Sequence, residues 1–375
     1  MQCTVCLGTR FEEVFRHDKL KVFSALRDAP YREKFRFDAV LMRCTRCGFV
    51  GQNPSKKLQD FLTNFYTHES SFLTAPPAAG MMNNKSAFNI EFMRTHVKAP
   101  VRRVLEIGSY DGYFLDSVRE AIGAREAVGV EILKMKNRYL KVRVVNDYYP
   151  TKKLAGEKFD LIIMMSVLEH IFTPRDFMRE IDANLSEKGS VVISIPNEGL
   201  AFKYGMPSYQ HQHISYFTPA TIRRFLASTG FRTDAIYTKD LDRILVVASR
   251  AKGKPHAIVT KDDSSTGLKK RYAQTLARFK RITKDPRVAL YGACNAAHNL
   301  IQMAATNPAT LLFDGDPRKA GKYFCDMKKP IHSWEKIDAF GVSDVLIIPL
   351  AFTPAIYGFL KKQPLDASVK KLFDI

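Results

Sequence analysis

The chain has 375 residues, of which 46% are hydrophobic and 26% are charged. These proportions are ordinary for a folded globular protein and the length suits two or three domains, so a disordered or low-complexity scaffold is excluded. The net charge of +20 favours an anionic substrate or a nucleic acid as a partner, and much of it lies between Arg250 and Arg287, where 12 residues are basic and 3 are acidic.

The sequence contains no apolar run of the roughly 18 residues that a membrane-spanning helix needs. Its first residues also lack the basic segment followed by an apolar segment that marks a signal peptide. We therefore expect a cytoplasmic protein with no membrane partner. Nothing in the sequence indicates an oligomeric state.

Four of the six cysteines form two CxxC pairs near the amino terminus. Cys3 and Cys6 make up one pair, Cys44 and Cys47 make up the other, and 37 residues lie between them. Each pair can place two thiolates on one ion, and two pairs complete the closed tetrahedral shell of four sulfurs that Zn²⁺ favours. Unpaired thiols or a redox-active pair fit less well, because neither pair begins a helix after a strand. The sequence predicts a structural zinc in a zinc-ribbon-like module of residues 1–65.

A glycine-containing turn follows an apolar run in the middle of the chain. Residues 103–107 are predicted to form a buried strand, Gly108 to Gly112 a turn, and the residues after them a helix. The two glycines let the backbone approach a ligand closely, and the helix behind them presents free N–H groups. A dinucleotide-binding loop needs a third glycine, and Leu115 occupies that place.

Further predicted strands end in polar residues. Glu131 ends the run at 127–131, Asp147 follows the next unit, and Ser166 follows the run at 159–165. A fifth apolar run completes the series. Strands that alternate with helices and carry polar residues at their carboxyl ends predict an open parallel α/β sheet with a binding crevice at those ends.

Together these segments resemble the class I S-adenosylmethionine-dependent methyltransferases, which have a Rossmann-like parallel sheet. The resemblance rests on Glu106-Ile107-Gly108-Ser109-Tyr110-Asp111-Gly112, Gly129-Val130-Glu131, Asn146-Asp147 and Ser166-Val167-Leu168-Glu169-His170. It implies that Glu131 holds the ribose and Asp147 the adenine amine of S-adenosylmethionine. The cofactor-binding residues that it implies are Glu106, Gly108, Ser109, Asp111, Gly112, Glu131, Asp147 and Ser166. An α/β domain without a ligand is the alternative.

Three histidines lie near the predicted crevice. His211 and His213 follow the fifth strand, and His170 follows the fourth. Methyl transfer from a sulfonium needs alignment and a base that exposes the nucleophile, and histidine can take up a proton near neutral pH. In an extended segment His211 and His213 would face the same way. We therefore consider His213, His170 and His211 as candidate catalytic residues, with a packing role for each as the alternative.

The whole chain resembles a narrower family, the deoxysugar C-methyltransferases that act on nucleotide-linked 4-keto sugars. In that family the histidine segment usually reads Tyr-His-Glu-His-x-x-Tyr-Phe, and here it reads Gln210-His211-Gln212-His213-Ile214-Ser215-Tyr216-Phe217. The resemblance implies a nucleotide-sugar substrate and a histidine base. Gln212 cannot take up a proton, so methylation at carbon and methylation at oxygen both stay open.

A polar connection rich in helix breakers precedes a basic amphipathic helix. Apolar residues recur at helical spacing from Leu268 to Ile282, with lysines and arginines between them. This pattern indicates a solvated helix that packs along one stripe. A nucleic-acid or anionic-lipid surface is the minor alternative, because aromatic residues do not alternate with the charges as base stacking requires.

A second α/β unit is predicted towards the carboxyl end. Asp314 lies 22 residues after Gly292, at the position that holds a ribose in nucleotide-binding folds. One glycine is too few for a tightly held dinucleotide, and the family resemblance implies instead a domain that contacts the nucleotide-sugar. The expected domains are a zinc-binding module (1–65), a methyltransferase domain (66–250), a basic linker and helix (251–284) and a C-terminal Rossmann-like domain (285–375).

Three functions fit these features. The first is an S-adenosylmethionine-dependent enzyme that methylates a nucleotide-linked deoxysugar at carbon, or a sugar at oxygen. The second is a nucleic-acid methyltransferase, motivated by the net charge and the zinc module. The third is a non-catalytic binding protein that retains the cofactor fold.

Overall fold

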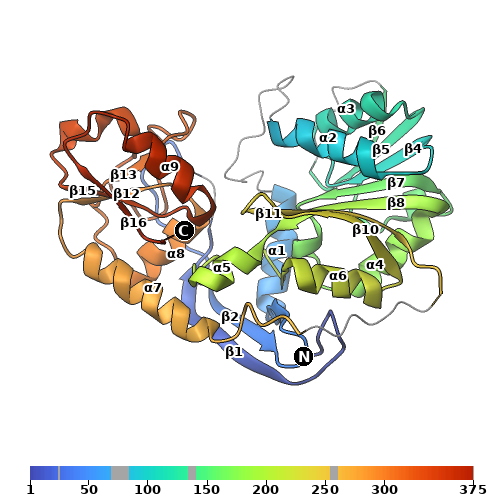
Figure 1. Cartoon of the computed structure of the whole chain (residues 1–375), viewed down its shortest axis with the longest axis horizontal. Coiled ribbons are helices and arrows are strands. Elements are labelled where there is room, and N and C mark those ends of the chain that lie inside the picture. The colour runs from blue at the N-terminus through green and yellow to red at the C-terminus, as the bar shows by residue number, and fades with distance from the viewer. Residues whose placement is uncertain (24–25, 69–83, 134–140, 254–260, 375) are drawn as a thin grey trace.

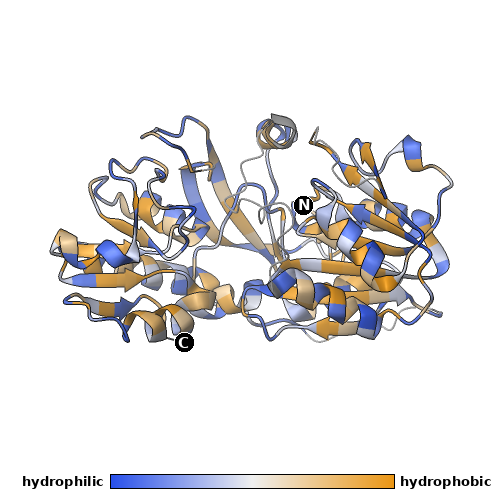
Figure 2. Ribbon diagram, turned by 90° about the horizontal axis from the view of Figure 1, so that it is seen from above, coloured by the Kyte–Doolittle hydropathy of each residue, from blue (hydrophilic) through white to orange (hydrophobic). Residues whose placement is uncertain are grey.

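Two α/β domains lie at opposite ends of the molecule, and the strands near the amino terminus run between them (Figure 1). The computed structural model describes residues 1–23, 26–68, 84–133, 141–253 and 261–374. Figure 2 shows that hydrophobic residues follow the strands of both α/β domains, which places a separate core around each sheet. Among the described helices, none combines the length and the hydropathy needed to cross a bilayer.

The middle domain is built on a seven-stranded sheet with the order β10-β11-β8-β7-β4-β5-β6. Its strands are β4 (Arg103–Ile107), β5 (Glu126–Glu131), β6 (Val142–Asn146), β7 (Phe159–Met165), β8 (Leu185–Pro196), β10 (Phe231–Tyr237) and β11 (Arg243–Arg250). Strands β4 to β8 pair in parallel, whereas β11 runs antiparallel to both β8 and β10. The carboxyl ends of the five parallel strands therefore share one edge, as the sequence predicts.

Helices cover both faces of this sheet because successive strand residues point to opposite sides (Figure 1). Val104 packs with Leu115 and Val118 in one cluster, while Leu105 packs with Phe177 in another. The helices are α2 (Asn84–His96) and α3 (Tyr113–Ile122) on one face, α4 (Pro174–Asn184) and α6 (Pro219–Ser228) on the other, and the short α5 (Glu198–Tyr204) after β8.

The amino-terminal strands form a four-stranded sheet with the order β1-β2-β3-β9. Its strands are β1 (Phe11–Lys21), β2 (Arg36–Cys44), β3 (Val50–Gly51) and β9 (Ser215–Tyr216). The helix α1 (Lys56–His68) follows β3 in the chain. Strand β9 comes from the segment that follows the predicted catalytic histidines, and it pairs antiparallel with β3. The sheet of the cysteine-containing module is thus completed by a strand from the middle of the chain.

The carboxyl-terminal domain has a parallel sheet with the order β14-β13-β12-β15-β16. Its elements are β12 (Val288–Tyr291), α8 (Asn295–Ala304), β13 (Leu312–Asp314), β14 (Ile331–Ser333), β15 (Asp344–Ile347), α9 (Thr353–Leu360) and β16 (Ser368–Lys371). The three predicted strands are confirmed, and the structure adds β14 and β16. This arrangement is Rossmann-like, with strand order reversing at β12.

The basic helix is α7 (Leu268–Ile282), which contacts β1 and α8. Leu268, Tyr272 and Phe279 form its buried stripe. On the solvent side, Lys269 pairs with Glu13 at 3.6 Å, and a second ion pair joins Arg278 to the last described residue. This helix therefore packs along one stripe and keeps most of its charges solvated, as the pattern indicates. Arg271 instead donates to the carbonyls of Phe202, Thr266 and Ser264.

Candidate active site

The glycine turn after β4 lies close to the loop after β7, which is the neighbour of β4 in the sheet. Gly108 has φ of 77°, and a Cβ at this position would lie 2.9 Å from Cγ2 of Val167. Gly112 has φ of 84° at the amino end of α3 and has no side chain to cap the helix. Both positions need glycine because other residues rarely adopt this conformation. The first N–H of α3, that of Tyr113, donates to the Asp111 carboxylate at 3.1 Å, and this end of the helix faces the carboxyl edge of the sheet.

Two buried carboxyl groups lie at this edge. Glu131 accepts hydrogen bonds from the backbone N–H of Tyr110 at 2.8 Å and of Leu133 at 2.9 Å, so its carboxylate is held in place. Glu106 is fully buried, and burial raises its pKa to about 8, with smaller contributions from Glu131 and Asp111. Its Oε2 has no hydrogen-bond partner among the described residues. A ligand that donates hydrogen bonds or carries positive charge would satisfy this oxygen.

The other predicted cofactor residues lie at the same edge with different exposure. Asp147 accepts a hydrogen bond from Thr151 Oγ1 at 2.7 Å and lies 3.3 Å from Lys153 Nζ, and these contacts lower its pKa. Ser166 is exposed at the end of β7 with φ of 55°. The Ser109 hydroxyl is buried against Gly129. All eight predicted residues therefore lie at this edge of the sheet, but the Ser109 side chain points into the sheet.

The four predicted metal-binding cysteines come together. Cys3 Sγ and Cys47 Sγ are 3.6 Å apart, as are Cys6 Sγ and Cys44 Sγ, and all four sulfurs lie within 4.8 Å of one another. Tetrahedral zinc with Zn–S bonds of about 2.3 Å would space its sulfurs about 3.8 Å apart. The donor set and its spacing therefore fit Zn²⁺.

The connection after β11 covers this cysteine cluster. The Asp262 N–H donates to the carbonyl of Cys47 at 3.1 Å, and the Asp262 carboxylate accepts a hydrogen bond from Thr218 at the start of α6. Gly48 has φ of 83°, and a Cβ there would lie 1.9 Å from the Asp262 carbonyl oxygen. The cluster is thus attached directly to the middle domain.

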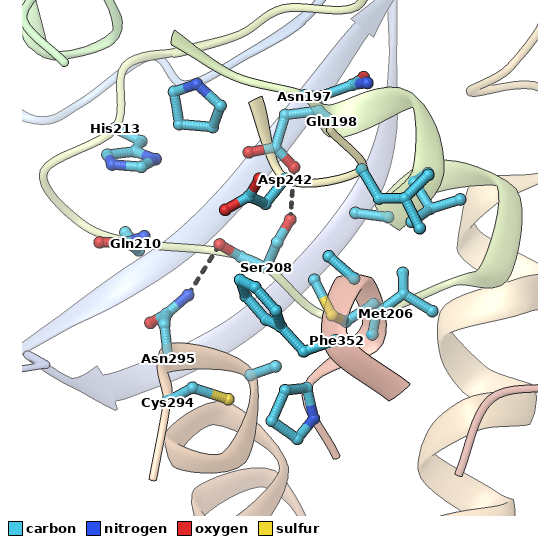
Figure 3. A pocket seen from close by; sticks show the side chains of 18 residues that line it. Asn197, Glu198, Met206, Ser208, Gln210, His213, Asp242, Cys294, Asn295 and Phe352 are labelled. Atoms are coloured by element: carbon cyan, nitrogen blue, oxygen red, sulfur yellow. Dashed lines mark hydrogen bonds between the residues drawn. The ribbon is translucent and has the colours of Figure 1, made fainter. Parts of the chain in front are cut away.

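A cavity of about 220 Å³ opens between the middle and carboxyl-terminal domains (Figure 3). Its walls come from the segments after β8, before β11, after β12 and after β15, and from the loop that carries His213. The polar side chains that line it are Asn197, Glu198, Ser208, Gln210, His213, Asp242 and Asn295. Because β11 is antiparallel to β8, both segments meet at the carboxyl edge that carries the predicted cofactor residues.

We call residues 207–214 the histidine loop, and two other parts of the chain hold it. Gln52, next to β3, donates to the carbonyls of Gln210 at 2.7 Å and of His213. Asn295 and Asn299 of α8 both donate to the carbonyl of Tyr209, at 2.9 and 2.7 Å. The loop conformation is therefore fixed by residues far away in the sequence.

The three predicted histidines separate into different environments. His213 lines the cavity, and the His170 ring lies 4.9 Å from the His213 ring without lining the cavity. His211 points instead to the amino-terminal sheet, with Nε2 3.3 Å from the Phe37 carbonyl oxygen. The expectation that His211 and His213 face the same way is wrong, because the His213 N–H bonds to the Gln210 carbonyl at 3.1 Å and makes the segment a turn.

Burial keeps these histidines neutral. Loss of solvation lowers the pKa of His170 and of His211 to about 4, and lowers the pKa of His213 well below its ordinary value. The Nδ1 of His170 lies 2.9 Å from the Gln212 carbonyl oxygen, which favours a proton on Nδ1. Glu169, His170 and His213 also bring three potential ligand atoms within 4.8 Å, but only the cysteines provide four donors.

Several residues of the site are not indicated by any sequence motif. Gln52, Asn295 and Asn299 hold the histidine loop by hydrogen bonds. The sequence alone does not indicate such a role for single polar residues outside a motif. Glu198 and Asp242 line the cavity at the edge where ligands bind. A signal for Glu198 does exist, because it directly follows Pro196-Asn197 at the carboxyl end of a predicted parallel strand.

Comparisons with known proteins agree with this geometry. Residues 72–236 match the model of a methyltransferase domain. A probable S-adenosylmethionine-dependent methyltransferase of Mycobacterium tuberculosis is 26% identical over 113 residues, which are 29% of this chain and 40% of that protein. The chain therefore matches less than half the length of this curated relative.

Solved structures also resemble part of the chain. An S-adenosylmethionine-dependent methyltransferase from Mesorhizobium loti is 15% identical and covers 43% of this chain and 95% of its own, with a TM-score of 0.35. The plantazolicin methyltransferase BpumL in complex with SAH is 12% identical and covers 44% of this chain and 82% of its own, with a TM-score of 0.36.

The middle of the chain therefore matches a methyltransferase domain and has the class I, Rossmann-like fold. The family match gives the domain type, and the strand order, in which one antiparallel strand is inserted next to β8, is that of this Rossmann-like class.

Proposed function

We propose that this chain transfers a methyl group from S-adenosylmethionine to a carbon atom of a nucleotide-linked 4-keto deoxysugar, and that a histidine of the cavity assists proton removal. We propose further that Zn²⁺ bound by Cys3, Cys6, Cys44 and Cys47 has a structural role. Four cysteine ligands leave no open coordination position, so this metal takes no part in the chemistry.

The observation that supports this proposal most is the position of the cavity. It opens at the carboxyl edge that also carries Gly108 and Glu131, and the Val167 loop connects the two regions by packing on Gly108 and leading to His170. In open parallel sheets, ligands bind at this edge. A donor at the glycine turn and an acceptor in the cavity would thus lie at the same edge of one sheet, with β7 between β4 and β8.

Two walls of the cavity, which is otherwise mostly apolar, offer different groups to the proposed substrate. The amino end of α8 reaches it through Cys294 and Asn295, and no side chain caps this helix. Free N–H groups at a helix amino end favour phosphate oxygens. On the opposite side, His213 and Glu198 provide groups that exchange protons. This division supports a diphosphate-linked sugar whose reactive part faces the middle domain.

Bound S-adenosylmethionine would supply an electrophilic methyl group on a sulfonium. The chain's own residues must then hold the acceptor, exclude water and move one proton. His213 is 7% exposed and lines the cavity, whereas His170 supports it from behind and His211 lies elsewhere. His213 is therefore the histidine placed to act on the acceptor. A sugar hydroxyl could be activated in the same cavity, which keeps O-methylation as the second candidate.

Labelled methyl transfer tests this function directly. The full chain is incubated with methyl-labelled S-adenosylmethionine and a panel of nucleotide-linked 4-keto and hydroxyl sugars, and NMR locates the new methyl group. We expect the label on the carbon next to the keto group. Label on an oxygen atom would show that the reaction is O-methylation instead. The absence of label on every sugar, despite S-adenosylhomocysteine binding, would contradict the proposal.

The substitution His213→Ala tests the assignment of the histidine. We expect kcat to fall about 100-fold or more, since a group that assists proton transfer or stabilises a developing oxyanion contributes roughly 10²–10³-fold. The dissociation constant of S-adenosylhomocysteine should change less than about twofold. His96→Ala, on α2 and outside the cavity, serves as the control. Unchanged turnover in His213→Ala would remove its role.

A further inference from the structure

Glu198 is the carboxyl group of the cavity with no assigned role. It begins α5 directly after β8, and it is 5% exposed although it lines the cavity. Its Oε2 accepts a hydrogen bond from Ser208 Oγ at 2.7 Å (Figure 3). Its Oε1 has no hydrogen-bond partner among the described residues. One oxygen is therefore held in place while the other is available to a ligand.

The residue that the family pattern would use cannot fill this place. Gln212 carries an amide, and its Nε2 donates to the Phe23 carbonyl at 3.2 Å on the side of the amino-terminal strands. It is not among the residues that line the cavity. The cavity nevertheless contains two carboxyl groups, Glu198 and Asp242. Asp242 forms an ion pair with Lys85, which leaves Glu198 as the carboxyl group without a cationic partner.

We propose that Glu198 is the residue that accepts the proton of the acceptor, and that neutral His213 donates a hydrogen bond to the acceptor oxygen. This inference rests on the proposed function, because it assigns proton transfer for that reaction. It places the two groups on different walls of one cavity, with Glu198 from the segment after β8 and His213 from the histidine loop.

The proton and the electrons balance in this assignment. The C–H bond next to the keto group breaks, its proton moves to Glu198 Oε1, and its electron pair forms the C=C bond of an enolate. The oxygen becomes negative and accepts the hydrogen bond from His213. The enolate carbon then bonds to the methyl group as the S–CH₃ bond breaks, and the keto group re-forms. The product gains a methyl group, S-adenosylhomocysteine leaves, and Glu198 returns its proton to solvent.

The electrostatics of the cavity support these roles. Burial raises the pKa of Glu198 to about 7, although the Ser208 hydrogen bond acts in the opposite direction. Burial lowers the pKa of His213, and its neighbour His170 lowers it further. A base works best when its pKa lies near the working pH, and a neutral imidazole is a good donor to a developing oxyanion. Glu169 is buried nearby, and burial together with the charge of Glu198 raises the pKa of its carboxyl group.

The test measures hydrogen exchange as well as methyl transfer. The probe is thymidine-diphosphate-4-keto-6-deoxyglucose in deuterated buffer with S-adenosylhomocysteine bound, and NMR follows deuterium entering the carbon next to the keto group. Glu198→Gln keeps the shape of the side chain and can still accept from Ser208. We expect it to lose exchange and methyl transfer by about 1,000-fold or more, with S-adenosylhomocysteine affinity within about twofold of the wild type.

Two further variants separate the roles. His213→Gln should slow exchange and transfer by about 10-fold to 100-fold, because an amide can still donate to the oxygen. Glu33→Gln, a buried glutamate outside the cavity, should match the wild type. Folding is checked for every variant by its melting temperature and its S-adenosylhomocysteine affinity.

The outcomes distinguish this inference from the proposed function. A wild type that transfers methyl to the keto sugar, together with an equally active Glu198→Gln, overturns the role of Glu198 alone. Loss of exchange in Asp242→Asn but not in Glu198→Gln also overturns it. A wild type that binds S-adenosylhomocysteine but neither exchanges nor methylates the probe overturns the proposed substrate, and the assignment of Glu198 falls with it.

Discussion

The two halves of the candidate site are built in different ways. The cofactor edge consists of short motifs, each at the end of its own strand, and β4 to β7 place them within one sheet. The histidine loop has no such frame. It is held by Gln52 from the amino-terminal module and by Asn295 and Asn299 from α8. The predicted cofactor residues thus lie in one domain, whereas the proposed acceptor cavity depends on three.

Among the substitutions that compare these two regions, the largest effect is expected from removing the cysteine cluster. Cys44→Ser should reduce zinc from one ion to none per chain, and it should cost several kcal/mol in the stability of the amino-terminal module, because structural zinc supplies folding energy. The histidine loop would lose its Gln52 anchor, so methyl transfer should fall at least about 100-fold. Metal analysis and activity assays measure both effects.

The contrast between the cofactor edge and the histidine loop would be wrong if the loss of zinc also abolished cofactor binding. We expect S-adenosylhomocysteine affinity in Cys44→Ser to stay within about threefold of the wild type. Cys325→Ser, a buried cysteine outside the cluster, should keep one zinc per chain. A wild-type protein without zinc and with four freely titratable thiols would contradict the structural metal.

A smaller effect is expected at the cofactor edge. Glu131→Ala should weaken S-adenosylhomocysteine binding about 30-fold, since it removes a ribose acceptor and leaves the N–H groups of Tyr110 and Leu133 without their partner. Calorimetry measures the affinity. Glu120→Ala makes the same charge change on the exposed side of α3 and should bind normally. Equal affinities in both variants would exclude Glu131 from the cofactor site.

A third substitution tests the anchoring of the histidine loop. Asn299 is 1% exposed and donates to the carbonyls of Pro207 at 2.6 Å and of Tyr209 at 2.7 Å. Asn299→Ala should reduce methyl transfer about tenfold and leave S-adenosylhomocysteine affinity unchanged, because only the acceptor side loses its support. Asn307→Ala, in an exposed turn, is the control. A parallel loss of cofactor affinity would show that the two regions are coupled.

The smallest effect concerns pH and stability. Burial raises the pKa of Glu106 and of Glu169 to about 8, so the folded chain holds protons that the unfolded chain has lost. Their stabilising contribution is complete below the unfolded pKa of 4.5 and is lost as pH rises through about 8. The buried His170 and His211 act in the opposite direction, but only below their ordinary pKa of 6.5.

Between about pH 6.5 and 8 the free energy of unfolding should therefore fall as pH rises, by about 1.4 kcal/mol per pH unit for each such carboxyl group. Urea unfolding at three pH values measures the slope. Glu106→Gln, at the cofactor edge, and Glu169→Gln, next to the histidine loop, should each reduce this slope by the contribution of one carboxyl group. A slope that neither variant changes would contradict the buried, protonated state of both.

The sequence predicts the cofactor edge well because each of its motifs is local. The strand before Gly108 and the one before Ser166 are apolar runs that need no partner to be recognised, and both are confirmed. The roles of Glu131 and Asp147 towards the cofactor stay predictions. Paired CxxC spacing also predicts which sulfurs come together, since each pair makes its own turn.

The histidine loop could not be predicted because distant contacts determine it. Alternation along an extended strand would place His211 beside His213, but the loop turns, and His211 bonds to Phe37 instead. The partners that cause this turn, Gln52 and Asn299, have no motif. The walls contributed by the carboxyl-terminal domain, such as Phe352, follow from the packing of two sheets that sequence patterns describe only separately.

The anchoring of the histidine loop by α8 has a consequence for the newly made chain. Domains generally fold in the order in which they leave the ribosome. Residues up to Arg250 complete the seven-stranded sheet, so the donor-binding half can form while later residues are still being translated. Asn295 and Asn299 emerge only afterwards. A nascent chain would thus complete its cofactor edge before the later residues that close the other walls of the cavity are made.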